Sequence, residues 1–95
     1  MGEGLNVNTV TARTLLREIL ASRILTYSGH AKNEMAKDGL TTQDVMNVLR
    51  AGIVEPSEFE RGSWRHRVKT NTMCVVMVLV SERETAIVTA WRIRR

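Results

Sequence analysis

The chain has 95 residues and a formal net charge of +4, a size that allows one domain with a modest core and no separate cofactor-binding domain. A single cysteine excludes an internal disulfide, and together with two distant histidines it provides no close set of metal ligands. Because no segment approaches the roughly 18 apolar residues of a membrane span and the start lacks a signal-peptide pattern, we expect a cytoplasmic protein without metal, cofactor or membrane partner.

The first part of the chain predicts helices. Residues 1–8 contain two glycines and two asparagines and indicate a flexible arm. Apolar residues then recur at intervals of three and four, which indicates an amphipathic N-terminal helix over residues 9–26. Ser28 can cap a second, short helix, and Gly39 can end it in the left-handed conformation.

A third helix and four strands follow. Thr41 and Asp44 predict the helix start, and Gly52 is expected to end this helix as Gly39 ends the second. We predict the strands at residues 53–60, 63–70, 73–81 and 84–94. Pro56 cannot donate a backbone hydrogen bond, so the first strand should lie at an edge or break there. The predicted fold class is α+β, with two or three N-terminal helices packed on one face of a four-stranded antiparallel meander, in one domain over residues 1–95.

Positive charge is concentrated in the last third of the chain. Residues 1–60 hold six Lys/Arg against eight Asp/Glu, a net of −2, and residues 61–95 hold eight against two, a net of +6. Eleven of the fourteen basic residues are arginine, whose planar guanidinium binds phosphate oxygens through two parallel hydrogen bonds. This distribution favours a nucleic-acid ligand, and a solvated basic surface is the alternative.

The second predicted strand carries much of this charge. Alternation in an extended strand places Arg65, Arg67 and Lys69 on one face, where mutual repulsion favours a polyanionic or acidic partner. Glu58 and Glu60 on the preceding strand can neutralise Arg65 or Arg67 across the hairpin. The opposite face holds Trp64, His66 and Val68. If that face packs against the helices, His66 is a core residue; otherwise it is available for function.

Several short motifs occur in a recognisable order. They are Tyr27-Ser28-Gly29-His30-Ala31, Met35-Ala36, Gly39-Leu40-Thr41 and Asp44-Val45 with the helix that follows, and Thr89 and Trp91 close the pattern. The chain thereby resembles, over roughly residues 27–93, a family of small bacterial proteins of formerly unknown function. Those proteins are similar to the RelE and MqsR toxins, within a wider group of metal-independent ribonucleases that includes barnase-like and colicin-like domains.

The resemblance implies a RelE-like core over residues 27–95 and a toxin-type, metal-independent endoribonuclease. Attack by a ribose 2′-OH would leave a 2′,3′-cyclic phosphate. The implied partners are RNA, on or off the ribosome, and a cognate antitoxin protein. The catalytic residues assigned on this basis are His30, Arg65, Arg67, Thr89 and Arg92, and the substrate-binding residues are Lys32, His66, Lys69 and Trp91.

Two positions depart from the family pattern. Glu34 and Asp38 stand where the family usually has arginine, which removes two cations near the second helix. The alternative function is therefore a noncatalytic module that binds nucleic acid or an acidic protein through its basic sheet face.

Overall fold

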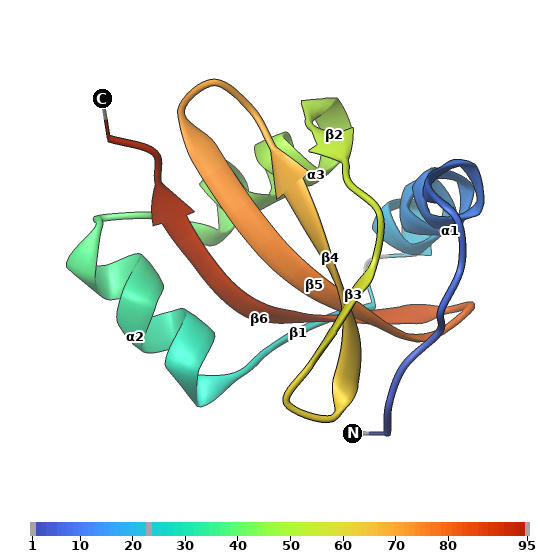
Figure 1. Ribbon diagram of the computed structural model, residues 1–95. Coiled ribbons are helices and arrows are strands. Elements are labelled where there is room, and N and C mark those ends of the chain that lie inside the picture. Colours follow the sequence, from blue (N-terminus) through green and yellow to red (C-terminus); the bar gives the residue numbers. More distant parts are fainter. Residues whose placement is uncertain (1, 23, 95) are drawn as a thin grey trace.

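Three helices and six strands form the described part of the chain, residues 2–22 and 24–94, in a computed structural model (Figure 1). The helices are α1 (Thr9–Ser22), α2 (Gly29–Lys37) and α3 (Thr42–Ala51). The strands are β1 (Leu25–Tyr27), β2 (Ile53–Val54), β3 (Glu58–Glu60), β4 (Ser63–Lys69), β5 (Met73–Ser81) and β6 (Glu84–Arg92). The predicted α+β class is confirmed.

The sheet is mixed, because one strand that the sequence does not predict joins it. Strand order is β1-β6-β5-β4-β2, and β3 also pairs with β4. β4, β5 and β6 are antiparallel neighbours joined by short turns, as expected. The predicted first helix extends to residue 26, whereas Leu25–Tyr27 form β1, parallel to β6. The antiparallel meander therefore describes only the strands after α3.

Pro56 divides the first predicted strand in two. β2 ends at Val54, β3 begins at Glu58, and both pair antiparallel with β4. Proline has no backbone N–H to donate to the ladder, so the break falls where the sequence predicts it. As a separate short strand, β3 pairs with the first half of β4 and carries Glu58 and Glu60 alongside the basic side chains.

The helix ends follow the predicted capping chemistry with one exception. Thr41 and Asp44 form a capping box at the start of α3, and Gly39 after α2 has φ 64°. Gly52 does not adopt the expected left-handed conformation, since its φ is −74°. Glycine is needed there for space, because a Cβ would lie 2.6 Å from the backbone oxygen of Val48.

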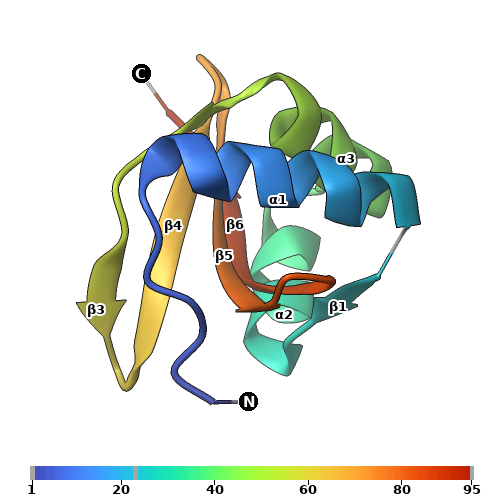
Figure 2. The ribbon, with the colours of Figure 1, turned by 90° about the vertical axis from the view of Figure 1, so that its right-hand side faces the viewer.

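The core lies between the helices and one face of the sheet. A single cluster of buried side chains combines residues of all three helices with residues of β2, β4, β5 and β6. In Figure 2, α2 and α3 lie on one side of β5 and β3 lies on the other. Large members of the cluster are Leu16, Ile19, Met35, Leu49, Val75, Met77, Leu79 and Ile87.

The segment before α1 lies against the sheet. The backbone N–H of Trp64 donates to the carbonyl of Glu3 at 2.7 Å, and the N–H of Leu5 donates to the carbonyl of Leu79 at 2.8 Å. The described part of the expected flexible arm, residues 2–8, is thus hydrogen-bonded to β4 and β5. Within the described ranges, no helix has both the length and the apolar character required to cross a membrane.

Candidate active site

The basic strand β4 presents its two faces as the alternation predicts. Across the sheet, Arg67 pairs with Val76, which pairs with Thr89 on β6. On the other face of the sheet, His66 pairs with Met77 of the core cluster. The basic face therefore carries Thr89 in the same cross-strand row as Arg67, on the face opposite His66.

Ser28 fixes the start of α2 to β6. Its backbone N–H donates to the carbonyl of Ile87 and its hydroxyl donates to the carbonyl of Val88, both at 3.0 Å. The same hydroxyl oxygen accepts a hydrogen bond from the N–H of Ala31 at 3.0 Å, as an N-cap does. His30, in the first turn of α2, is thereby held beside β6.

A β-bulge in β6 provides the carbonyl that Ser28 uses. Val76 pairs with Thr89 and Met77 pairs with Ile87, so Val88 is the additional residue of β6 at this register shift. A bulged residue leaves its backbone groups partly outside the ladder and redirects the neighbouring side chains. The bulge therefore anchors the start of α2 at the residue that precedes Thr89.

These elements line one open pocket together with the turn between β3 and β4. The start of α2 and this turn lie at the same end of the sheet, at the bottom of both views (Figures 1 and 2). The pocket has a volume of about 500 Å³. Its lining residues are Ser28, His30, Glu60, Arg61, Arg65, Val88 and Thr89. Three of the predicted catalytic residues, His30, Arg65 and Thr89, thus share one pocket with a carboxylate and a second arginine.

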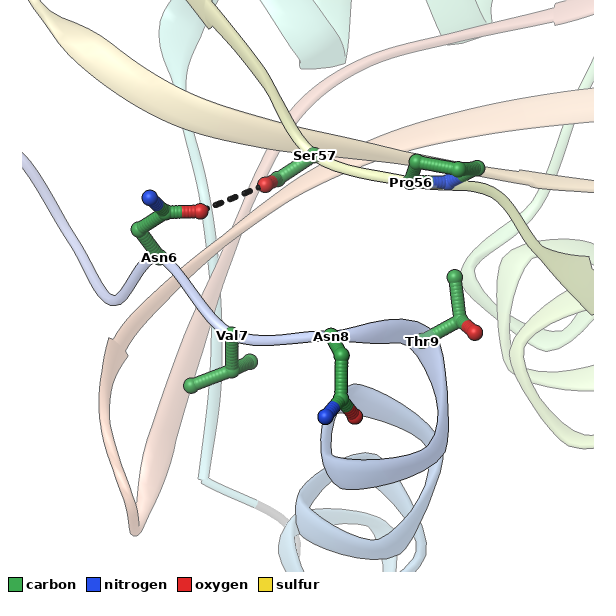
Figure 3. A pocket seen from close by; sticks show the side chains of 6 residues that line it. All are labelled: Asn6, Val7, Asn8, Thr9, Pro56 and Ser57. Atoms are coloured by element: carbon green, nitrogen blue, oxygen red, sulfur yellow. Dashed lines mark hydrogen bonds between the residues drawn. The ribbon is translucent and has the colours of Figure 1, made fainter.

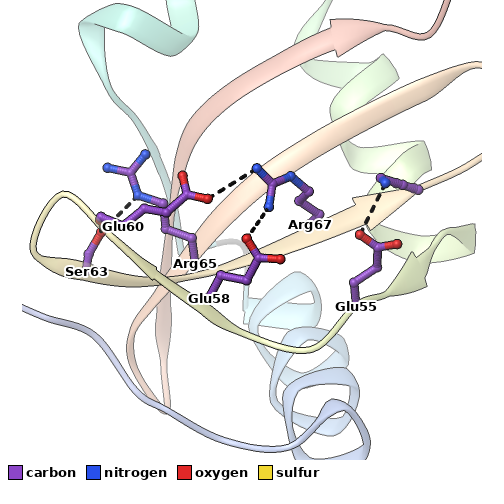
Figure 4. A network of polar contacts seen from close by, with 7 residues as sticks. Glu55, Glu58, Glu60, Ser63, Arg65 and Arg67 are labelled. Atoms are coloured by element: carbon purple, nitrogen blue, oxygen red, sulfur yellow. Dashed lines mark hydrogen bonds and ion pairs between the residues drawn. The ribbon is translucent and has the colours of Figure 1, made fainter.

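The arginines of β4 differ in their partners. Arg67 makes ion pairs with Glu58 at 3.0 Å and with Glu60 at 3.3 Å (Figure 4). Burial opposes the charge of this guanidinium, yet the hydrogen bonds and charges of the two glutamates raise the pKa of Arg67 above its ordinary value. The expected neutralisation across the hairpin is therefore found at Arg67, which holds Glu60 at the edge of the pocket.

Arg65 keeps its positive charge available to a ligand. Its Nε donates to the hydroxyl of Ser63 at 3.1 Å, and among the described residues it takes part in no ion pair. The hydrogen bond restrains the guanidinium without neutralising it. An anion entering the pocket would therefore meet a positioned cation.

Arg92 lies at the other end of α2. Its backbone N–H donates to the carboxylate of Asp38 at 2.8 Å, and its Nε donates to the carbonyl of Asp38 at 2.9 Å. Arg94 also pairs with this carboxylate at 2.9 Å. The hydrogen bond from the Arg92 backbone, together with the two arginine charges, lowers the pKa of Asp38. Asp38 follows His30 by eight positions, or roughly 12 Å along the helix axis, and Arg92 is not among the pocket residues.

The four residues predicted to bind substrate lie outside the pocket lining. Lys32 is exposed on α2, and Lys69 pairs with Glu55 at 3.3 Å near the opposite end of β4. Trp91 is partly buried and pairs with Cys74 across the sheet. Lys32 is exposed and the side chains of Lys69 and Trp91 are partly exposed, so all three reach solvent outside the pocket.

His66 is a core residue. Its side chain is 0% exposed, its Nδ1 lies 3.1 Å from the carbonyl oxygen of Glu55, and its Nε2 has no hydrogen-bond partner among the described residues. Because His66 lies on the face of β4 that packs against the helices, it is the core residue that the sequence predicts as one of two alternatives. The ring offers no surface to a substrate.

Sequence reasoning does not place Ser28, Arg61 or Val88 in the site. Ser28 is predicted only as a helix cap and Arg61 only as a turn residue, and both also line the pocket. Glu60 belongs to the general acid-base groups of the sequence, but it is interpreted as a partner for arginine and is not assigned to the site. The sequence Glu60-Arg61-Gly62 could have indicated these residues, because it places two opposite charges side by side at the tip of a predicted hairpin.

A second hollow, of about 420 Å³, lies between the arm and the segment that joins β2 to β3 (Figure 3). The hydroxyl of Ser57 donates to the side-chain oxygen of Asn6 at 2.8 Å across it. Its lining contains no charged or titratable side chain, since it consists of Asn6, Val7, Asn8, Thr9, Pro56 and Ser57. The pocket beside His30 is therefore the better candidate for chemistry.

Comparison with known families gives one match. The sequence profile of a domain of unknown function, DUF4258, matches residues 27–92, which is more than half of the chain. The matched segment includes every residue that lines the pocket. Searches of curated proteins and of solved structures give no match.

Proposed function

The chain belongs to the DUF4258 family, a domain of unknown function, and we propose from its pocket that it is a metal-independent endoribonuclease of the RelE and MqsR toxin type. The observation that carries the proposal is the convergence of His30, Glu60 and Arg65 on one pocket. Two side chains that can transfer protons, together with an unneutralised cation, are the groups that phosphodiester cleavage by an internal hydroxyl requires.

The reaction needs a base and an acid. A base removes the proton of the ribose 2′-OH, the oxygen attacks the adjacent phosphorus, and the bond to the 5′-oxygen breaks as an acid protonates that oxygen. The products are a 2′,3′-cyclic phosphate and a free 5′-OH. His30 and Glu60 are the side chains of the pocket suited to these two roles.

The remaining groups stabilise and position the phosphate. Arg65 would offset the additional negative charge of the transition state, since its guanidinium is held by Ser63 and paired with no carboxylate among the described residues. The hydroxyl of Thr89 would position a phosphate oxygen or the ribose. Arg67 acts through Glu60, which it holds by an ion pair of 3.3 Å.

Analysis of the product ends tests the proposal. Purified protein is incubated with mixed RNA in EDTA, with and without ribosomes, and the ends are assayed for 2′,3′-cyclic phosphate. His30→Ala and Glu60→Gln should each reduce cleavage by about 10²- to 10⁴-fold, the usual contribution of a proton-transfer group. Cleavage that is unchanged in His30→Ala would remove His30 from the reaction and would indicate a contaminating nuclease.

A matched pair of variants separates the site from general charge. Arg65→Ala and Arg50→Ala each remove one arginine, and Arg50 is exposed in the last turn of α3. Arg65→Ala should reduce cleavage by about 10²- to 10³-fold, as loss of a transition-state donor does, whereas Arg50→Ala should leave it near the wild-type rate. Equal effects would argue against a phosphate site at Arg65.

A second candidate is a noncatalytic nucleic-acid-binding module, because several cations that a cleavage site would need already have partners in the protein. Arg67 pairs with Glu58 and Glu60, Lys69 pairs with Glu55, and Asp38 holds the backbone and Nε of Arg92. RNA binding without cyclic-phosphate ends, both with and without ribosomes, would support this module.

The toxin proposal also includes a cognate antitoxin as a protein partner. A short neighbouring gene that encodes a co-purifying protein would support it.

A further inference from the structure

Arg61 occupies a backbone conformation that an arginine rarely adopts. It is the first residue of the two-residue turn between β3 and β4, with φ 49°, followed by Gly62 with φ 83°. Successive positive φ values match the twist of a tight hairpin, and asparagine, aspartate or glycine usually fills the first position. Among the described residues, Arg61 is the one non-glycine residue with positive φ.

The turn places this residue at the pocket. Arg61 lines the same pocket as His30, Arg65 and Thr89 and is exposed to solvent. Among the described residues it takes part in no ion pair. The neighbouring carboxylate of Glu60 is engaged by Arg67, so it is already partly neutralised. Among the described residues, Arg61 is therefore a second cation at the pocket that has no carboxylate partner. The tight turn fixes the position of its backbone.

We propose that Arg61 is a phosphate-binding residue of this site. It contacts the backbone of a single-stranded RNA that enters the pocket across the β3–β4 turn, while Arg65 contacts the phosphate that reacts. The inference rests on the proposed function for the identity of the ligand. Arg61 has an unfavourable backbone conformation, takes part in no ion pair among the described residues, and lines one pocket with Arg65. An anion that both cations bind explains this arrangement.

Arg83 provides a matched control. It lies in the turn between β5 and β6, is exposed, and carries the same charge, but its φ is not positive and it lies away from the pocket beside His30. Arg61→Asn and Arg83→Asn therefore change net charge equally. Asparagine tolerates positive φ, so Arg61→Asn should keep or raise the thermal midpoint, and Arg61→Gly serves as a second variant with the same backbone freedom.

Binding is measured by fluorescence anisotropy with a labelled oligonucleotide of 2′-deoxy residues, which has no 2′-OH and cannot be cleaved by this route. The slope of log K against log salt reports the number of phosphates contacted, at about 0.7 per phosphate for a single strand. Arg61→Asn should weaken binding roughly 10-fold and reduce the slope by about 0.7. Arg83→Asn should change neither quantity, and Arg61→Lys should retain the slope.

The two proposals fail in different ways. A slope unchanged in both Arg61→Asn and Arg61→Gly, or reduced equally in Arg83→Asn, overturns the role of Arg61 even if the wild type cleaves RNA. No binding of the oligonucleotide by the wild type also overturns it. Loss of slope specific to Arg61, in a protein that produces no cyclic-phosphate ends, supports Arg61 as a phosphate ligand and overturns the ribonuclease proposal.

Discussion

Replacing Ser28 by alanine should destabilise the protein more than loss of an ordinary helix cap. The Ser28 hydroxyl makes two hydrogen bonds of 3.0 Å, one with the N–H of Ala31 and one with the carbonyl of Val88. Loss of the cap costs about 1 kcal/mol, and loss of the second bond costs about 1 kcal/mol more. The expected decrease in the free energy of unfolding is therefore about 2 kcal/mol, or roughly 8–16 °C in Tm for a domain of this size.

Thr41→Ala is the matched control for this prediction. Thr41 caps α3 through its hydroxyl oxygen, which accepts from the N–H of Asp44 at 3.1 Å, and its hydroxyl makes no tie to the sheet among the described residues. Its replacement should cost about 1 kcal/mol. Urea unfolding of both variants, followed by circular dichroism, gives the two free energies. Equal losses would show that the hydrogen bond from Ser28 to Val88 contributes nothing to stability, and would refute its role in fixing α2 to β6.

Three further predictions concern the frame around the site. Gly52→Ala should lower the free energy of unfolding by about 2 kcal/mol, because the new Cβ would lie 2.6 Å from the Val48 backbone oxygen; a urea midpoint equal to that of the wild type would contradict this. The hydrogen bond from the backbone N–H of Arg92 lowers the pKa of Asp38 below its ordinary value of 3.8. The ionised carboxylate of Asp38 therefore stabilises the folded protein above pH 3.8, and this stabilisation is lost as the pH falls through the lower pKa of the folded state. Asp38→Asn should therefore be less stable than wild type at pH 7, and the difference should shrink on acidification below about pH 4 in a series of thermal melts; a constant difference would exclude this linkage. Burial raises the pKa of the Cys74 thiol, so a thiol reagent at pH 8 should label the folded protein much more slowly than the urea-unfolded protein, and equally fast labelling would show that this strand opens readily.

The fold could be predicted from periodicity because the strong patterns are local. Alternation along β4 predicted which side chains face the helices, and the apolar run of β5 predicted its central position, both of which the register confirms. The short β1 could not be predicted, because its three residues are too few to show the alternation of a strand. Parallel pairing with β6, 60 positions further along in the case of Leu25 and Thr85, has no local sequence signal.

The site could be predicted only in part for the same reason. His30, Arg65 and Thr89 were selected on residue type and family resemblance, and they share a pocket. The exclusion of Arg92 depends on Asp38, which lies 54 positions earlier in the sequence. The inclusion of Arg61 depends on a backbone angle. A tertiary contact excludes Arg92 from the pocket and a turn conformation includes Arg61. The spacing of residue types in the sequence predicts neither feature.

The segment that matches the family lacks α1, although α1 forms part of the core. The matched segment begins at residue 27, inside β1 and after α1. Yet α1 contributes Ala12, Leu16, Ile19 and Leu20 to the buried cluster. A protein truncated to residues 27–92 would leave the apolar surface under these four side chains open to water, so we expect it to aggregate or to recruit a substitute helix. Work on the matched segment should therefore retain the residues that precede it.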